Sequence, residues 1–291
     1  MISQQIVNGL ALGSIYAMVA VALTLSIGVI NFLNFSIPGL FMVGGFGLWV
    51  FIGLGLPWPA AFALALIAGG LLAFVVERFT WRWMRNVEHF VPLVSSMAFL
   101  ILFENFAVTV WGSDLKTVPP AFGAADIRLS GLVISIPQLI GLVLSVLIVF
   151  GLAQMLARTS VGRAFRTIAE NPETATMLGV NVNRAVLVLF ISSGIFAALA
   201  GLLFAINYRQ VHPFMGEIVG LKGISAMVIG GMGNVWGAIL GGLLIGLTEV
   251  GAISFLGADF VDIAVYGLLL VILALRPTGL LGSALAGRGR V

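Results

Sequence analysis

Long stretches of apolar residues are the feature that most constrains the fold of this chain. A bilayer crossing takes about 20 mostly apolar residues. Eight stretches qualify: 6–30, 36–54, 59–79, 90–111, 132–157, 185–208, 235–254 and 260–275. A ninth, 218–232, is short and glycine-rich, and is either a short span or a re-entrant half-helix that lines a cavity. We predict an all-α integral membrane protein, a polytopic bundle of eight or nine transmembrane helices.

The composition supports a membrane protein. Apolar residues make up 60% of the 291 residues and charged residues only 9%, whereas a soluble domain carries roughly a quarter charged residues. No loop is long enough to fold independently, so we expect a single transmembrane domain over residues 1–291. The chain has no cysteine and two histidines, His89 and His212, and therefore we expect no metal centre.

Basic residues gather in alternate loops and predict the orientation. Three clusters hold ten of the fourteen: Arg78, Arg82 and Arg85; Arg158, Arg163, Arg166 and Arg184; Arg276, Arg288 and Arg290. The other loops hold Lys116, Arg128 and Arg209, with Lys222 at the edge of the short segment. Cytoplasmic loops are the basic ones, so the clusters and the C-terminus are expected in the cytoplasm. Nine crossings, with the N-terminus outside, fit the arginines better than eight. Because these residues flank apolar spans, we expect no nucleic-acid partner.

The loop at residues 158–184 contains several residues that typically begin or end helices. Ser160 is expected to cap a helix over about 161–170. Asn171 precedes Pro172, which ends that helix and allows Asn171 to cap a second one. Gly179 is a left-handed stop. The apolar faces of these two short helices either pack back on the bundle or dock a cytoplasmic partner.

This loop resembles the coupling segment of ABC importer permeases of the branched-chain amino acid, LivH-type, family. The matching residues are Gly162, Arg163, Ala164, Arg166, Glu170, Asn171, Ala175, Gly179, Val180 and Asn181. Further matches run from Asn8–Ala17 and Glu77–Arg78 through the glycine-rich stretch 220–242 to Arg276–Gly282. The resemblance implies that the loop, including Leu178, inserts into an ATP-hydrolysing subunit.

The resemblance implies the rest of the machine. This chain would be the permease subunit of a multi-pass bacterial inner-membrane importer, forming half of the translocation path. Its partners would be a second, LivM-type permease, two cytoplasmic ATP-binding subunits and a periplasmic or lipid-anchored solute-binding protein. No cofactor is expected on this chain, because no phosphate loop is present and Mg-ATP would bind the partner subunits.

One stretch departs from the family pattern. After Asn31-Phe32-Leu33-Asn34-Phe35 the family continues Ala-His-Gly-Glu, but this chain has Ser36-Ile37-Pro38-Gly39. The substrate therefore stays open: branched-chain or other amino acids, an amide or urea, or a small carboxylate.

Polar residues inside the spans are candidates for the substrate path, because such residues face protein or water. They are Asn31, Asn34, Phe35, Glu104, Asn105, Lys222 and Glu249. At position 104 we expect glutamine in many relatives. We expect Lys222 to pair with Glu249 or Glu104 as a structural tie.

Three functions are compatible with these features. The first is the importer permease. The second is a self-contained secondary transporter or channel that uses Glu104, Lys222 and Glu249 as an ion relay. The third is a membrane enzyme, which the sequence disfavours because it has no catalytic constellation.

Overall fold

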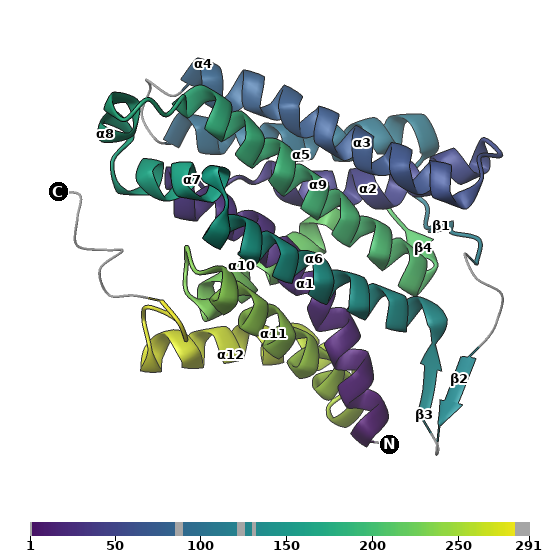
Figure 1. Ribbon diagram of the computed structural model, residues 1–291. Helices are drawn as coiled ribbons and strands as arrows, with labels where there is room; N and C mark the ends of the chain where they lie inside the picture. The colour runs from purple at the N-terminus through teal and green to yellow at the C-terminus, as the bar shows by residue number, and fades with distance from the viewer. Residues whose placement is uncertain (1, 85–89, 121–125, 130–131, 283–291) are drawn as a thin grey trace.

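The computed structural model describes residues 2–84, 90–120, 126–129 and 132–282 (Figure 1). Arg85, His89, Arg288 and Arg290 lie outside these ranges. The long helices are α1 (Ile2–Ile30), α2 (Ser36–Gly53), α3 (Trp58–Val76), α5 (Phe90–Trp111), α6 (Ile136–Arg158), α9 (Val182–Tyr208), α10 (Met215–Gly230), α11 (Val235–Phe255) and α12 (Val261–Leu275). The short ones are η1 (Glu77–Trp81), α4 (Arg82–Met84), α7 (Ser160–Glu170), α8 (Pro172–Met177) and η2 (Ala258–Phe260). The helical membrane-protein prediction is confirmed.

Four short strands depart from the all-helical expectation. β1 (Lys116–Thr117) pairs antiparallel with β4 (Gln210–Val211), and β2 (Asp126–Leu129) pairs antiparallel with β3 (Leu132–Ser135). The span predicted from residue 132 was wrong at its start, because α6 begins at Ile136. Ser135 is extended and forms a capping box with Gln138, which fixes the first turn there.

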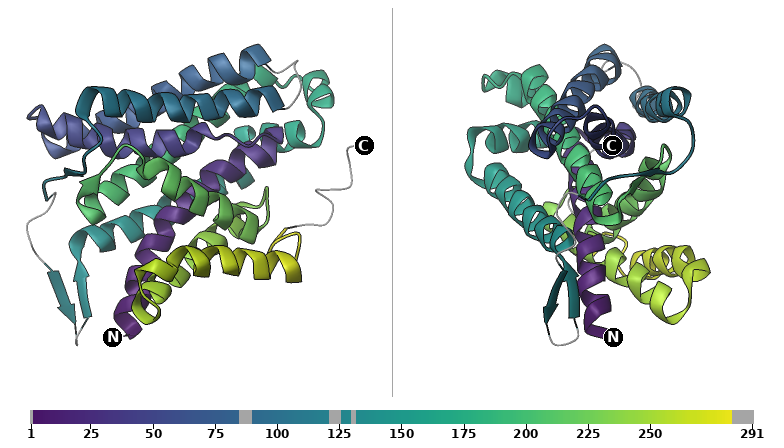
Figure 2. Two further views of the ribbon diagram at one scale, coloured as in Figure 1. Left: turned by 180° about the vertical axis from the view of Figure 1, so that it is seen from behind. Right: turned by 90° about the vertical axis from the view of Figure 1, so that its right-hand side faces the viewer.

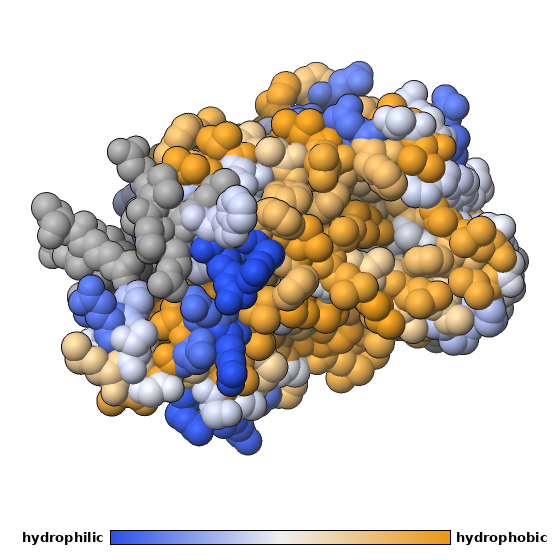
Figure 3. All heavy atoms as spheres, turned by 90° about the horizontal axis from the view of Figure 1, so that it is seen from above, coloured by the Kyte–Doolittle hydropathy of each residue, from blue (hydrophilic) through white to orange (hydrophobic). Residues whose placement is uncertain are grey.

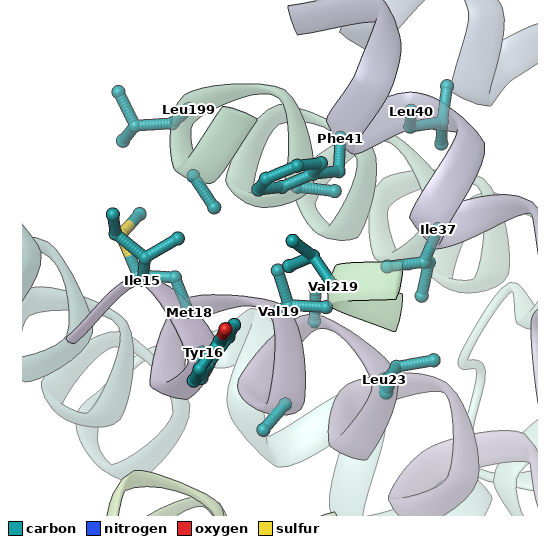
Figure 4. Packing of buried hydrophobic residues seen from close by; sticks show 14 of the residues in the cluster. Ile15, Tyr16, Met18, Val19, Leu23, Ile37, Leu40, Phe41, Leu199 and Val219 are labelled. Carbon is teal, nitrogen blue, oxygen red and sulfur yellow. The ribbon is translucent and has the colours of Figure 1, made fainter. Parts of the chain in front are cut away.

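Helix α1 is the centre of the bundle. In its most apolar 18-residue window 89% of the residues are buried, against 11% for the span at Ala258–Leu275. Figure 4 shows α1 side chains, including Ile15, Val19 and Leu23, against residues of α2, α9 and α10. In Figure 2, α2, α3, α5 and α9 lie on one side of α1, and α11 and α12 lie on the other.

Helix α11 packs through glycine on two faces. Added β-carbons at Gly237 and Gly241 would overlap the backbone of α10, and at Gly242 and Gly246 the backbone of α1. In the sequence, Gly237 and Gly241 are four residues apart, as are Gly242 and Gly246, and this spacing predicts close helix packing because glycine allows backbones to approach directly. The structure confirms that prediction.

Helix α10 decides the number of passes. Among the described residues, eight helices are long and apolar enough to span a membrane, and α10, at 16 residues, is a shorter ninth. It begins just after β4 and ends where the backbone of residues 229–230 bonds to Leu280 and Leu281. Because Gly28, near the end of α1, also contacts Gly233 at that end, α10 joins opposite ends of the bundle. The nine long helices of the described residues therefore run between the two ends of the bundle, with Ile2 and the 278–282 segment at opposite ends.

Two segments share one arrangement in opposite directions. A long helix, α1 or α9, ends at a left-handed residue, Asn31 (φ 50) or Arg209 (φ 55), and a shorter helix, α2 or α10, follows. No other non-glycine residue has positive φ in the described part of the chain. The ninth residue of each short helix contacts the long helix of the other segment: Gly44 meets Ala198 and Gly223 meets Val19. Inverted repeats of this kind are common in transporters.

The ends of the bundle differ in charge. Arg78 and Arg82, the arginines of residues 158–184 and Arg276 lie toward the end that carries α4, α7 and α8, which we call the α7–α8 end. Lys116 and Arg209 lie at the opposite, strand-bearing end. Hydrophobic side chains cover most of the face in Figure 3, and its largest hydrophilic group lies toward the α7–α8 end. Lys222 was expected at the edge of the short segment, but it lies in the middle of α10 and is buried inside the bundle at 5% exposure.

Candidate functional sites

Three helices meet at a buried ion pair in the middle of the bundle. Lys222 Nζ on α10 lies 2.7 Å from Glu249 Oε1 on α11. The Tyr16 hydroxyl on α1 donates a hydrogen bond of 2.8 Å to Glu249 Oε2. Lys222 Nζ also lies 5.8 Å from the Tyr16 ring centroid, within the range of a cation–π contact. All three side chains are buried.

This triad satisfies its own charges. Both oxygens of Glu249 are occupied, and the pair carries no net charge. Of the two partners predicted for Lys222, the structure selects Glu249. The role of Tyr16 was missed, because a single tyrosine in an apolar helix looks like an ordinary core residue. The triad ties α1, α10 and α11 together, which supports the interpretation of a structural tie.

Glu104 on α5 has the opposite surroundings. It is 5% exposed, and its Oε1 atom has no hydrogen-bond partner. Its carboxylate faces Glu217, in the first turn of α10, and interacts with the backbone N–H of that residue. Helix starts favour such an anion. Glu217 was not among the candidates, since only the fold brings it to α5.

No basic group offsets this pair of acids in the described part of the chain. No ion pair there involves Glu104 or Glu217. His212 precedes α10, and burial lowers its pKa below the ordinary value of 6.5, so it is mostly neutral at pH 7. The site is therefore negatively charged when both carboxylates are ionised.

The break between α1 and α2 holds three more candidates. Asn31 is exposed, with the left-handed backbone that asparagine tolerates better than most residues. Asn34 is buried, and its Oδ1 accepts from the N–H of Ser36 at 3.1 Å and from its hydroxyl at 2.7 Å. The Phe35 N–H donates to Ser96 Oγ on α5 at 3.0 Å. These bonds satisfy the backbone where α2 begins.

The departure at Ser36–Gly39 lies against the same helix. A β-carbon at Gly39 would be 2.9 Å from Phe103 Cδ2 and 3.3 Å from Leu100 Cα. The position where the family pattern has an acid thus lies beside Phe103, the residue before Glu104.

The substrate-path candidates do not form one site. The structure separates them into the triad, the Glu104–Glu217 pair and the break at residues 31–36. Asn105 belongs to none of these, because it is exposed and its Nδ2 donates to the Ile101 carbonyl on its own helix.

The loop at the α7–α8 end folds largely as predicted. Asn171 Oδ1 accepts from the N–H groups of Glu173 and Thr174, which caps α8, and Gly179 is left-handed with φ 81. The predicted cap of α7 was wrong by one residue. Thr159 is the cap, with its Oγ1 accepting from the Gly162 N–H at 3.3 Å, because Ser160 is already helical.

The predicted coupling residues divide between two faces of this loop. Gly162 and Ala175 are buried, and Ala164 is half-buried. Gly162 lies directly on the Leu156 carbonyl, where a β-carbon would overlap. The exposed ones are Arg163, Arg166, Glu170, Asn171, Leu178 and Gly179.

Two apolar side chains at the end of α8 are uncovered. Met177 is 85% exposed and Leu178 is 69% exposed. Met177 was missed because nothing in the loop sequence distinguishes it from the buried apolar residues. These two adjacent apolar side chains are therefore available for contact with another molecule.

A cleft of about 270 Å³ separates α7 from the nearby helices. Its lining comes from α1, α6, α7 and α11 and includes Gly28, Ala153, Phe165, Arg166 and Trp236. The Arg166 guanidinium bridges the α6–α7 corner by donating to the Leu156 carbonyl. The loop is thus held to α6 and leans over the end of α1.

No group of three or more potential metal ligands occurs among the described residues.

Comparison with known proteins gives a match along nearly the whole chain. Residues 5–274 match the family model described as branched-chain amino acid transport system / permease component. The high-affinity branched-chain amino acid permease BraD of Pseudomonas aeruginosa is 33% identical, covering 96% of this chain and 95% of the relative. The permease LivH of Salmonella typhimurium is 30% identical over the same shares.

A more distant similarity links the chain to another import system. The autoinducer 2 permease LsrC of Yersinia pestis is 28% identical, over 87% of this chain and 68% of the relative. No solved structure matches.

Proposed function

Because this chain belongs to the family of branched-chain amino acid transport system permease components, we propose that it is the membrane-spanning subunit of an ATP-driven, binding-protein-dependent importer. It forms half of the translocation path for branched-chain amino acids or related small solutes. Its relatives are transport permease subunits, and like them the chain is a transport subunit rather than an enzyme.

The observation that carries this function is the end-to-end family match together with the exposed tip of α8. An ATP-driven permease needs a rigid surface on which a cytoplasmic subunit can act. The α7–α8 loop offers one, since Gly162, Phe165 and Ile168 anchor it inward while Met177 and Leu178 face outward. The tip inserts into the ATP-binding subunit, and the loop transmits movement to α6 and α9.

As such a subunit, the chain has a defined orientation in the membrane and a defined set of partners. The α7–α8 end lies in the cytoplasm of a bacterial inner membrane, with the 278–282 segment on the same side and Ile2 outside, as the arginine distribution favours. A second, homologous permease completes the path. Two ATP-binding subunits bind Mg-ATP, and a solute-binding protein delivers the cargo.

The alternative of a self-contained transporter has less support. The relay considered for this alternative uses Glu104, Lys222 and Glu249 and needs a free group at each position. Lys222 and Glu249 are instead bonded to each other, and Glu249 is also bonded to Tyr16.

Cysteine cross-linking tests the coupling surface. The chain has no native cysteine, so Met177→Cys or Leu178→Cys introduces a unique thiol. The thiol is labelled with a maleimide reagent that carries a photoreactive group. After illumination of the assembled importer, we expect a covalent adduct with the ATP-binding subunit, with a yield that changes when ATP is added. An active complex that gives no adduct from either position contradicts the assignment.

The matched control is Leu54→Cys. Leu54 is 72% exposed but lies in the turn between α2 and α3, at the opposite end of the bundle. It is expected to react with soluble thiol reagents and to give no adduct with the ATP-binding subunit.

A further inference from the structure

Glu104 is unlike the other buried glutamates in the described part of the chain. Glu249 has Lys222, and Glu77 has Arg78 and Arg82 acting on it. The charged group acting on Glu104 is a second acid, Glu217. A buried carboxylate is strongly disfavoured unless a cation or donors offset it, so this position lacks a positively charged group.

The site lies where the two inverted segments meet. Pro38, in the first turn of α2, contacts Gly216 and Gly220 of α10. Gly39 contacts Leu100 and Phe103 of α5. Phe103 is the residue directly before Glu104. In transporters, cargo sites lie between such segments, beside interrupted helices.

The Glu104 carboxylate lies behind contacts among α2, α5 and α10. Across α2 and α10, Pro38 meets Gly216 and Gly220, and the Met215 side chain of α10 reaches Gly45 of α2. Because Glu104 is only 5% exposed, a cargo reaches it when α10 moves away from α2 and α5. The same movement carries Glu217, since it lies in the first turn of α10.

We infer that Glu104, assisted by Glu217, receives the α-ammonium group of the amino acid cargo as it passes through the permease. An ammonium group has three donors and one positive charge, and it supplies the hydrogen bond that Glu104 Oε1 lacks. This inference rests on the proposed function and deepens it, because it selects amino acids over amides, urea and carboxylates as cargo.

Other cations fit the site less well. Ca²⁺ takes 6–8 oxygen ligands, and no group of three acidic or histidine ligands occurs among the described residues. Lys222, a cation of α10 itself, is held by Glu249 at 2.7 Å. The remaining alternative is that Glu104 binds a proton. The experiment below distinguishes proton binding from binding of an ammonium group.

The test is direct binding to the assembled membrane complex in nanodiscs without the solute-binding protein. The probes are L-leucine, L-leucinol, which keeps the ammonium and lacks the carboxylate, and 4-methylpentanoate, which keeps the carboxylate and lacks the ammonium. We expect leucine and leucinol to bind and 4-methylpentanoate not to bind. Glu104→Gln should weaken both amines by about tenfold or more, the usual effect of losing a charged hydrogen bond.

Three further variants complete the series. Glu104→Asp keeps the charge and should retain part of the binding. Glu217→Lys places a resident ammonium group beside Glu104, and we expect it to block leucine uptake in a complex that still folds. Thr109→Val is the matched control, since Thr109 is exposed on the same helix, and it should leave binding unchanged.

The outcomes separate this inference from the proposed function. Unchanged leucine and leucinol binding in Glu104→Gln overturns the inference, and so does a loss confined to the pH dependence of uptake, which indicates a proton site. If the wild-type importer with ATP and its binding protein takes up no leucine, isoleucine or valine, the proposed function itself fails.

Discussion

Of the three buried glutamates in the described part of the chain, Glu249 and Glu104 have very different surroundings. Glu249, where α11 meets α1 and α10, has a lysine at one oxygen and a tyrosine hydroxyl at the other. Glu104, where α5 meets the start of α10, has one oxygen without a partner and a second acid as its charged neighbour. Both are at most 9% exposed. Glutamate thus occurs once with both carboxylate oxygens bonded and once with a carboxylate oxygen that has no hydrogen-bond partner.

The difference shows how burial alone fails to identify a functional residue. Removing a charged partner from a satisfied pair leaves an uncompensated buried charge, which is strongly destabilising. Removing the charge of a buried group that has no partner can instead raise the free energy of unfolding. Stability measurements should therefore separate a glutamate kept for the fold from one kept for transport.

The largest effect is expected from Lys222→Ala, which leaves Glu249 unpaired. We expect it to lower the free energy of unfolding by about 3–5 kcal/mol. The measurement is equilibrium unfolding of the purified chain in mixed micelles with rising dodecyl sulfate. The double variant Lys222→Met with Glu249→Gln removes both charges and should recover most of the stability. A Lys222→Ala chain as stable as wild type would show that the pair is not a tie.

The next effect is expected from Tyr16→Phe. The change removes the hydroxyl that donates to Glu249 Oε2 at 2.8 Å and keeps the ring beside Lys222. Losing a hydrogen bond to a charged group costs about 1.5–3 kcal/mol, measured by the same unfolding assay. Tyr266→Phe, on the less buried α12, is the control. Equal small losses in both variants would contradict a special role for Tyr16.

Glu104→Gln should behave in the opposite way to a change in the triad. Glutamine keeps an oxygen acceptor for the Glu217 N–H and removes the uncompensated charge. We expect the free energy of unfolding to stay the same or rise, by up to about 1 kcal/mol, while binding of amines falls. A loss above about 2 kcal/mol would instead assign Glu104 to the fold, as a required helix cap.

The smallest effect is expected from Asn105→Ala, one residue along the same helix. Its side chain is exposed and bonds only to its own helix. Changes at such positions usually lie within about 0.5 kcal/mol, by the unfolding assay applied to the single chain. A larger loss that occurs only in the assembled importer would place Asn105 at the contact with the second permease.

Local features of this protein were readable from the sequence. Apolar length predicted eight spans, and the glycine spacing in α11 predicted close packing. The helix-capping and helix-ending residues Asn171, Pro172 and Gly179 predicted the two short helices of the α7–α8 loop. Each of these features depends on residues close together in the chain, and so no tertiary information was needed.

The errors also have a physical cause. The α6 helix was predicted from residue 132 because Leu132, Val133 and Ile134 are as apolar as the helix itself, and hydropathy does not distinguish a strand from a helix. Likewise, Ala175 and Leu178 were grouped in one docking surface, although only Leu178 is exposed. The fold decides which side of a six-residue helix faces the bundle.

The sequence by itself determined the class, the spans, the segregation of arginines and, through its motifs, the family. The tertiary structure decided that Lys222 belongs to Glu249, that Tyr16 completes the triad, and that Glu104 faces Glu217 without a cation. In a membrane bundle, faces toward lipid and faces toward protein are both apolar, so periodicity does not reveal which helices meet. The partners of buried charges are set by that meeting, and therefore only the folded chain could assign them.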